Sequence, residues 1–395
     1  MPLRPASEPY RDERVEAFFD NLLPDSRAIR ERIQRRFATS SGQAFDLLAE
    51  IGRDCVGAIQ LHPVGEQPPN VRECIVEDLT RSDVARILEK TVEPGFGRTI
   101  DDESVEFRIS LAGAQEKTAL LWRSSRWHLP LAPTPSTHIL KLPIGTANRG
   151  IDLSTSVENE WLCGQILQAF DLRIASSRIE TFGGFKVLVV ERFDRRLSED
   201  GSWWIRLPQE DLCQATGTPS ALKYESDGGP SAGQILRLLL GSENAESDRR
   251  SFFKTLVIFW MLCAIDGHAK NFSIFLLPAG GFRLTPLYDV LSAFPVLGHK
   301  AKQLAPEKVK MAMALEGTRR HYRWSTMQRR YWLDTAANHG LQGDSSRILD
   351  EAIESTPGVI DTVSRAIPKG FPTAVAEAIL DGVRRSATRL KGQIG

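Results

Sequence analysis

The sequence has few cysteines, and their arrangement fits neither a disulfide framework nor a zinc site. Only five occur among 395 residues. Their number is odd, they are widely spaced, and none belongs to a C-x-x-C pair, which indicates small buried apolar residues in a reducing compartment. These cysteines are Cys55, Cys74, Cys163, Cys213 and Cys263.

An apolar leader, a long apolar run and a net charge are also missing. The start, MPLRPASEPYRDERVE, has no signal-peptide core, and nowhere do 18 apolar residues follow one another. We therefore expect a soluble, cytoplasmic protein without membrane contact. Lysine plus arginine and aspartate plus glutamate number 50 each. No whole-chain field would therefore draw the protein to nucleic acid or anionic lipid, although local basic clusters remain possible.

The apolar pattern divides the chain into a helical start, a β-rich middle and a helical end. Helical spacing covers 13–36 and 45–52, and an amphipathic helix is predicted over 75–90. The segments FRISL, KTALLW, RWHLP, THILKLP and IETFGGFKVLVVERF then read as strands, with one helix, SVENEWLCGQILQAFDL, among them. Helical periods dominate afterwards, with the hairpin FSIFLLPAGGFRLTPLYD as the one interruption. We expect domains over residues 1–104, 105–208 and 209–395.

The stretch IDGHAKNFSIFLLPAGGFRLTPLYDV contains polar residues that suit phosphoryl transfer in a nucleotide cleft between two lobes. Such chemistry needs a carboxylate near the attacking hydroxyl and hard oxygen ligands for magnesium. Asp266 and Asn271 have the Asp-x4-Asn spacing of a kinase catalytic loop, and two short strands lead on to Asp289. A simpler reading stays open, in which Asp266 caps the preceding helix and Asp289 caps the segment VLSAF.

The β-rich part offers phosphate-binding and adenine-binding positions. In RISLAGAQEKTALLW, small residues from Ala112 to Ala114 let backbone N–H groups approach phosphate, and Lys117 adds charge. Lys141, in the apolar strand HILKLP, needs an anionic partner, which would be Glu160 or a nucleotide phosphate. The strand VLVVERF would present the backbone of residues 191–193 to an adenine edge.

Several motifs together resemble the HipA family of bacterial serine/threonine kinase toxins. They are ISLAGAQEKTALL, THILKLP, ERFDR, LPQEDLCQATG, KYESDGGP, IDGHAKNFSIF and LTPLYDVLSAFP, in the family's order. The resemblance implies an α+β, bilobal protein-kinase-like fold. It would have a small β-rich N-lobe, an all-helical C-lobe with a catalytic hairpin, and a small, mainly helical N-terminal subdomain in front.

The resemblance also implies a role for each matching residue. Asp266 matches the catalytic aspartate, and Asn271 and Asp289 match the magnesium ligands. Ser110 matches the serine whose autophosphorylation ejects the phosphate loop and silences the enzyme. The implied nucleotide-binding positions are Ala112, Gly113, Ala114, Gln115, Glu116 and Lys117 in the phosphate loop, Lys141 in the strand, Glu191, Arg192 and Phe193 in the hinge, and His268, Lys270 and Tyr288.

The implied function is an ATP- and Mg²⁺-dependent serine/threonine kinase that arrests growth, with an aminoacyl-tRNA synthetase as the expected substrate. A small DNA-binding helix-turn-helix antitoxin would neutralise it, and DNA would be contacted only through that antitoxin. The alternative is a catalytically weak or inactive kinase-fold protein that acts as an antitoxin-bound DNA co-repressor. Basic segments such as TRRHYRW and VRRSATRLKG leave this open.

The start of the chain departs from the family pattern. A β-rich segment usually precedes FFDNLLPDS, and here only about sixteen residues do, so we expect a truncated N-terminal subdomain. Phe18, Phe19, Leu22 and Leu23 would cluster there. Either they fold back onto residues 44–61, or a separate small partner protein covers them.

Overall fold

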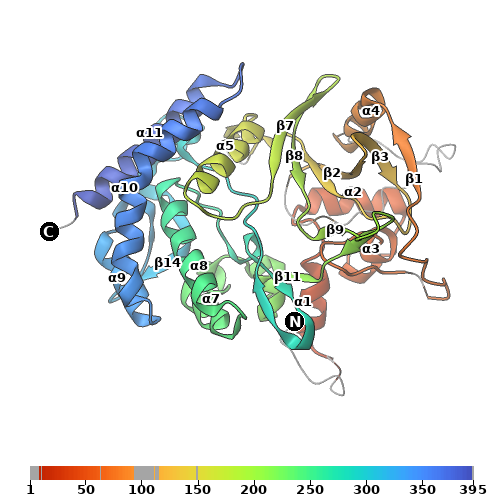
Figure 1. Ribbon diagram of the computed structural model, residues 1–395, viewed down its shortest axis with the longest axis horizontal. Coiled ribbons are helices and arrows are strands. Elements are labelled where there is room, and N and C mark those ends of the chain that lie inside the picture. The colour runs from red at the N-terminus through yellow and green to blue at the C-terminus, as the bar shows by residue number, and fades with distance from the viewer. Residues whose placement is uncertain are drawn as a thin grey trace. The chain divides into compact units, whose positions relative to one another are not determined.

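The computed structural model of the protein describes residue 9 and residues 11–62, 64–92, 111, 115–147 and 150–393. Contacts within the chain group into two compact units. The first contains the described residues up to Pro143 together with Ser176–Ala221, and the second contains Ile144–Ala175 together with the described residues from Leu222 onward (Figure 1). The chain therefore leaves the first unit once and returns to it, whereas three consecutive domains were expected. The expected boundary near residue 104 lies outside the described residues.

The first unit begins with three helices, as the apolar spacing predicts. They are α1 (Glu13–Asp20), α2 (Arg27–Phe37) and α3 (Ala44–Ile51). The side chains of Asp12 and Ser26 accept backbone hydrogen bonds at the starts of α1 and α2 and so satisfy N–H groups that have no partner within the helix.

The apolar side chains of α1 and the turn after it fold back onto α3. Phe18, Leu22 and Leu23 are buried. Leu22 and Leu23 belong to an apolar cluster, and the partly buried Phe19 packs against it. The cluster also contains Ala44, Leu47, Leu48, Ile51 and Cys55. These side chains are buried by the chain itself, so the argument for a separate small partner protein, which rested on their exposure, is wrong.

A six-stranded antiparallel sheet forms the main part of the first unit, in the order β1-β3-β2-β4-β8-β7 (Figure 1). The strands are β1 (Val76–Leu79), β2 (Lys117–Arg123), β3 (Arg126–Pro130), β4 (His138–Lys141), β7 (Ser177–Phe182) and β8 (Phe185–Glu191). Helix α4 (Arg81–Val92) packs Val84, Ile87 and Leu88 against this sheet.

The single amphipathic helix expected over 75–90 is therefore wrong in its first part. Residues 76–79 form β1, which pairs with β3, and the helix begins at Arg81. Tertiary pairing outweighs the helical period of these few residues because their backbone groups complete the edge of a sheet. The shorter elements of this unit are β9 (Arg195–Leu197), β10 (Trp204–Arg206), β11 (Gln209–Asp211) and α6 (Leu212–Thr216).

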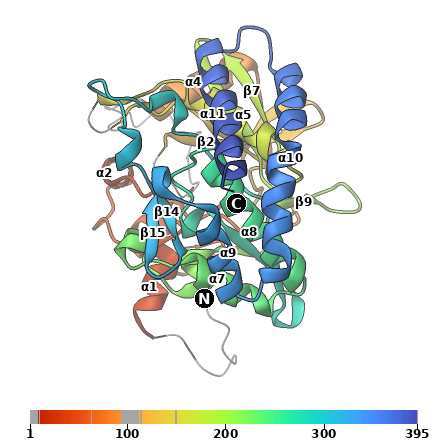
Figure 2. The same ribbon diagram turned by 90° about the vertical axis from the view of Figure 1, so that its left-hand side faces the viewer.

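The second unit is mainly helical. Its helices are α5 (Ser156–Ala169), α7 (Ala232–Leu238), α8 (Ala245–Met261), α9 (Arg329–Asn338), α10 (Gln342–Ala366) and α11 (Thr373–Lys391). Helices α10 and α11 run side by side as a hairpin (Figure 2). The short strands β5 (Gly145–Thr146) and β6 (Asp152–Leu153) pair before α5, and β12 (Ser273–Leu276) and β13 (Phe282–Leu284) form the expected hairpin.

A second hairpin shows that this part of the chain is not all-helical. Strand β14 (Lys310–Glu316) pairs with β15 (Arg320–Arg323). The segment KMAMALE consists of good helix formers, so its sequence gave no strand signal; pairing with β15 and burial of residues 311–315 decide its conformation. None of the described helices is long and apolar enough to cross a membrane.

Candidate functional site

Asp266 lies on a short loop beyond the end of α8, and its side chain is 58% exposed. Helix α8 ends at Met261 with Leu262 as its C-cap, so Asp266 does not cap it. The loop closes tightly, because the N–H of His268 donates to the carbonyl of Asp266 over 2.8 Å. Gly267 is required there, since a Cβ atom would lie 2.5 Å from the Phe259 ring.

Asn271 fixes the same loop from its other end. Its side-chain N–H₂ donates to the backbone carbonyl of Asp266 over 2.7 Å, and its own N–H donates to the carbonyl of His268 over 2.9 Å. The side-chain carbonyl of Asn271 therefore points away from the loop backbone and can serve as an oxygen ligand. His268, Lys270 and Asn271 are all buried.

Tyr288 connects this loop to the segment that carries Asp289. Its hydroxyl bonds Ser273 Oγ at 2.6 Å and the carbonyl of Lys270 at 2.8 Å. Asp289 follows in the left-handed region, with φ of 60°. The next helical turn begins after its N-cap at Ala293, so Asp289 caps no helix. Strain of this kind concentrates at functional sites because the surrounding structure must enforce it.

Asn159, on α5, holds the segment after Asp289 in place, and the sequence reasoning missed it. Its amide donates to the carbonyl of Ser292 and accepts from the N–H of Ser292, each over 2.8 Å. Ser292 Oγ in turn donates to the carbonyl of Leu262 over 2.6 Å. These buried bonds tie the Asp289 segment to the end of α8, from which the Asp266 loop emerges. An asparagine inside the otherwise apolar face of a helix was the available signal.

The oxygen atoms of Asn271 and Asp289 fit a nucleotide-associated Mg²⁺ ion. Both are hard donors, and one carboxylate with one amide is a typical protein share when phosphates and water complete the coordination. Within the described residues, no three His, Cys, Asp or Glu side chains gather into a preformed metal cage.

The first unit carries the predicted strand lysines. Lys117 on β2 and Lys141 on β4 are direct cross-strand partners. Gln115 donates its side-chain N–H to the carbonyl of Leu142, and the carbonyl of Glu116 accepts the N–H of Leu142 over 3.1 Å, so the start of β2 is fixed beside the end of β4. Two like charges opposite each other are unfavourable unless an anion lies near them. The pairing of Lys141 with Glu160, a residue of the second unit, stays a prediction.

Ser110 and the loop residues Ala112, Gly113 and Ala114 lie outside the described residues. The expectations attached to them stay predictions. Of the other residues predicted to bind phosphate, Gln115 and Lys141 are buried, and Glu116 forms an ion pair with Arg32 of α2.

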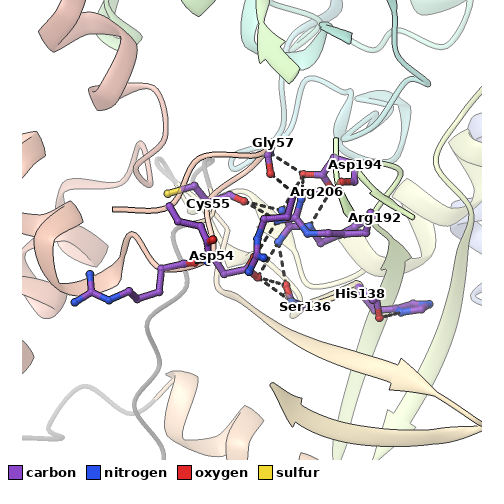
Figure 3. Close-up of polar contacts among 12 residues, drawn as sticks. Asp54, Cys55, Gly57, Ser136, His138, Arg192, Asp194 and Arg206 are labelled. Carbon is purple, nitrogen blue, oxygen red and sulfur yellow. Dashed lines mark hydrogen bonds and ion pairs between the residues drawn. The ribbon is translucent and has the colours of Figure 1, made fainter. Parts of the chain in front are cut away.

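The predicted hinge, residues 191–193, ends β8 and leads into a buried ion-pair cluster (Figure 3). The N–H of Glu191 donates to the carbonyl of Ser176, and the N–H of Arg192 donates to the carbonyl of Thr137, each over 2.8 Å. The guanidinium of Arg192 extends into the cluster, where it donates to Ser136 Oγ over 2.9 Å. The side chain of Arg192 therefore anchors the hinge backbone to the buried cluster.

The buried ion-pair cluster consists of Asp54, Arg192, Asp194, Arg195 and Arg206. Arg192 and Arg195 each bond an oxygen of Asp194 at 2.9 Å, and Arg195 bonds Asp54 Oδ1 at 2.9 Å. Asp54 also accepts from Ser136 Oγ over 2.6 Å. Asp54 follows α3, so the cluster connects the N-terminal helices to the hinge. No local pattern could predict this cluster, because Asp54 lies far from its arginine partners in the chain.

Burial and charge shift the pKa values in this region in ways that keep the ion pairs formed. Burial opposes the charged form of Asp54, but Arg195, Arg192 and Arg206 outweigh it and hold its pKa below the usual range. Burial also opposes the charged form of Asp194, but Arg192 and Arg195 outweigh it and hold its pKa below the usual range. Burial, assisted by Arg178, lowers the pKa of His138 on β4 to about 4, so this imidazole is neutral at pH 7.

The described site residues thus fall into two sets, each held together within its own unit. Asp266, His268, Lys270, Asn271, Tyr288 and Asp289 belong to the second unit. Gln115, Glu116, Lys117, Lys141, Glu191, Arg192 and Phe193 belong to the first.

Comparisons with known proteins identify the family of this chain. Residues 109–360 match the sequence model of the HipA-like C-terminal domain, and residues 1–62 match that of the HipA N-terminal domain. The chain is 32% identical over 309 residues to the putative kinase Y4mE of Sinorhizobium fredii, covering 78% of this chain and 71% of the relative. It is 27% identical over 291 residues to the serine/threonine-protein kinase toxin HipA of Shewanella oneidensis, covering 70% of this chain and 63% of that protein.

A solved structure has the same fold. It is HipA of Shewanella oneidensis in a complex with HipB and operator DNA. The two chains superpose with a TM-score of 0.76 at 21% identity, and the alignment covers 96% of this chain and 86% of the other.

Proposed function

Because this chain belongs to the HipA family of serine/threonine-protein kinases, we propose that it transfers the γ-phosphate of ATP to a serine or threonine hydroxyl of a protein. The observation that carries this proposal is the Asp266 loop. The Asn271 side chain donates to the Asp266 carbonyl, and the Tyr288 hydroxyl ties the same loop to Asp289. These bonds connect the loop that carries Asp266 and Asn271 to the segment that carries Asp289, which supports a shared role for the three groups.

Asp266 orients the substrate hydroxyl and accepts its proton as the oxygen attacks phosphorus. Its exposed side chain suits contact with another protein, and positioning together with proton acceptance accounts for most of what a kinase side chain contributes. Asn271 and Asp289 would hold Mg²⁺, which when bound neutralises charge on the phosphates.

Lys117 and Lys141 face each other across two strands and supply the positive charge that phosphate oxygens need. The phosphate loop from Ala112 to Lys117 covers the nucleotide through its backbone N–H groups. The backbone of residues 191–193 contacts the adenine edge, and His268, Lys270 and Tyr288 contact the nucleotide.

Ser110 is the proposed site of self-inactivation. A phosphoserine carries about −1.5 to −2 charges, which would compete with the nucleotide phosphates for the loop. The modified protein should therefore bind ATP poorly. Intact-mass and peptide mass spectrometry after incubation with ATP and Mg²⁺ would locate the phosphate, and an unmodified Ser110 would contradict this part of the proposal.

We further infer that the protein is a growth-arresting toxin neutralised by a small helix-turn-helix antitoxin, through which it reaches DNA. The complex of the Shewanella neighbour with HipB and operator DNA supports this. An aminoacyl-tRNA synthetase is the proposed substrate class, and the cytoplasm the proposed location. Both follow from the family resemblance.

The decisive experiment compares the wild-type protein with Asp266→Ala. Purified proteins are incubated with radiolabelled ATP and Mg²⁺, and phosphopeptides are compared between cells that express each form. The variant should lose about 10²–10⁴-fold in transfer rate, the range of a general base, and should not arrest growth.

The matched control for this experiment is Asp334→Ala, an exposed aspartate on α9. Its activity should equal that of the wild type. A wild-type protein that neither transfers phosphate nor arrests growth, like Asp266→Ala, would favour the alternative of an inactive, antitoxin-bound co-repressor.

A further inference from the structure

The segment KYESDGGP, residues 223–230, has no role in the proposed mechanism, yet it touches the Asp266 loop directly. The hydroxyl of Tyr224 donates a hydrogen bond to Oδ1 of Asp266. We propose that Tyr224 is a positioning residue for phosphoryl transfer: it holds Oδ1 of Asp266, so that Oδ2 faces the substrate hydroxyl. This inference rests on the proposed function, because it gives Tyr224 a task only if Asp266 is the base.

The ring of Tyr224 is itself held in place on two sides. It meets the ring of His268 edge-on, with centroids 5.0 Å apart and planes at 88°. The ammonium of Lys223 lies 5.6 Å from the centre of the Tyr224 ring. The carbonyl of Lys223 also accepts the N–H of Ala269 over 3.4 Å. The segment therefore contacts the loop at His268 and Ala269 as well as at Asp266.

The backbone behind Tyr224 is rigid because its next residue is anchored in the interior. The carboxylate of Glu225 is buried, accepts the N–H of Ala314 over 2.8 Å and pairs with Arg320 at 2.9 Å. The carbonyl of Tyr224 accepts the N–H of Gly229 over 2.9 Å. A Cβ atom at position 229 would lie 2.1 Å from the carbonyl oxygen of Leu222, so this turn requires glycine.

Asp266 needs such support because its side chain is more than half exposed. An exposed carboxylate rotates freely, and productive geometry at a reacting centre must hold within a fraction of an ångström. Within the described part of the chain, the hydrogen bond to this carboxylate falls on Oδ1, which leaves Oδ2 to the substrate. A phenol fixed on a rigid backbone thus selects one orientation of the base.

The test is Tyr224→Phe, which removes the hydroxyl and keeps the ring that contacts His268 and Lys223. Transfer from ATP with Mg²⁺ is measured with casein as acceptor and as autophosphorylation. We expect kcat to fall about tenfold, since a hydrogen bond to a charged group contributes roughly that factor, while KM for ATP stays within about twofold.

The matched control is Tyr331→Phe. The hydroxyl of Tyr331 also forms an exposed hydrogen bond, with Arg330, but lies on α9 outside the proposed site. Its kinetics and thermal midpoint should equal those of the wild type. Tyr224→Phe should keep the same midpoint as well.

A double-mutant cycle separates positioning from a general structural role. If Tyr224 acts through Asp266, then adding Tyr224→Phe to Asp266→Asn should not lower the residual single-turnover rate further. An equal loss in both backgrounds would overturn the inference, and so would an unchanged kcat for the single variant. A raised kcat would also overturn it, because Tyr224 would then be competing with the substrate for the carboxylate.

The same measurements distinguish this inference from the proposed function. Wild-type protein without any Mg²⁺- and ATP-dependent transfer to casein or to itself would sink both. Active wild type, inactive Asp266→Ala and normal Tyr224→Phe would sink the inference alone.

Discussion

Asp289 occupies a backbone conformation that residues other than glycine and asparagine seldom adopt, with φ of 60°. Asparagine tolerates this region and has nearly the same shape as aspartate, so Asp289→Asn changes the charge and little else. We expect the variant to keep its thermal midpoint and to lose on the order of 100-fold or more in transfer rate, because one preorganised charged group is removed from the phosphates.

Asp171 provides the control for Asp289→Asn. It also has a left-handed backbone, with φ of 59°, but lies in the turn after α5 and has no place in the site. Asp171→Asn should leave the transfer rate unchanged. Near-normal turnover of Asp289→Asn, or a midpoint well below that of Asp171→Asn, would show that Asp289 supports the fold and not the metal.

Single residues differ in how far the sequence could reveal them. Asp266 and Asn271 could be proposed from the sequence because their spacing lies within one short loop, and their roles stay predictions. Asn159 and Tyr224 were missed because their roles depend on contacts with residues 292 and 266, which no local pattern encodes. The hinge role of Arg192 stays a prediction, and its guanidinium lies among buried ion pairs.

At the scale of elements, long segments with a sustained period were predictable and short ones were not. Helices α8 and α5 and the strand β8 carry enough apolar residues to be predicted from the sequence. Strand β1 is only four residues long and borders a helix, so its residues were predicted as the first turn of that helix. Strand β14 is made of helix-forming residues, and only its pairing with β15 makes it a strand.

Strand β4 should make the stability of the first unit depend on pH through His138. Thr137 Oγ1 lies 3.0 Å from Nδ1 of His138 and can donate to it only while the imidazole is neutral. Its pKa falls from 6.5 to about 4 on folding, so the unfolded chain binds the proton more tightly. The contribution of His138 to the free energy of unfolding is complete above pH 6.5 and is lost as the pH falls toward 4. A shift of this size is worth roughly 3 kcal/mol.

The comparison that isolates this effect is His138→Phe, which keeps an aromatic ring against Trp127. Urea denaturation followed by tryptophan fluorescence gives the free energy of unfolding at pH 7, 5.5 and 4.5. The wild type should lose stability over this range faster than the variant. Parallel curves for the two proteins would mean that His138 is not protonated on unfolding.

At the scale of the whole molecule, the two units should respond separately to damage in one of them. Asp54→Ala would leave Asp194 as the carboxylate that pairs with Arg192 and Arg195, and would remove the carboxylate that pairs with Arg206. Removing one partner of a buried charge group costs about 3–5 kcal/mol. Hydrogen exchange followed by mass spectrometry should show lost protection in α3, β4 and β8. Peptides from α8, α10 and α11 should keep theirs.

The control for Asp54→Ala is Asp46→Ala on α3, whose carboxylate bonds Ser41 near the surface. It should leave protection unchanged in both units. A loss of protection that spreads equally over both units in Asp54→Ala would show that they unfold as one.

The buried ion-pair cluster also sets an order of events while the protein is being made. Asp54 and its partner Arg195 are 141 residues apart in the chain. At about 5–20 residues per second, a ribosome needs roughly 7–28 s to make the intervening length. During that interval the first three helices leave the ribosome without the guanidinium groups that will later pair with Asp54. A nascent chain therefore has its N-terminal helices before it has a hinge, and it cannot act as a kinase until long after its first residues are available to other molecules.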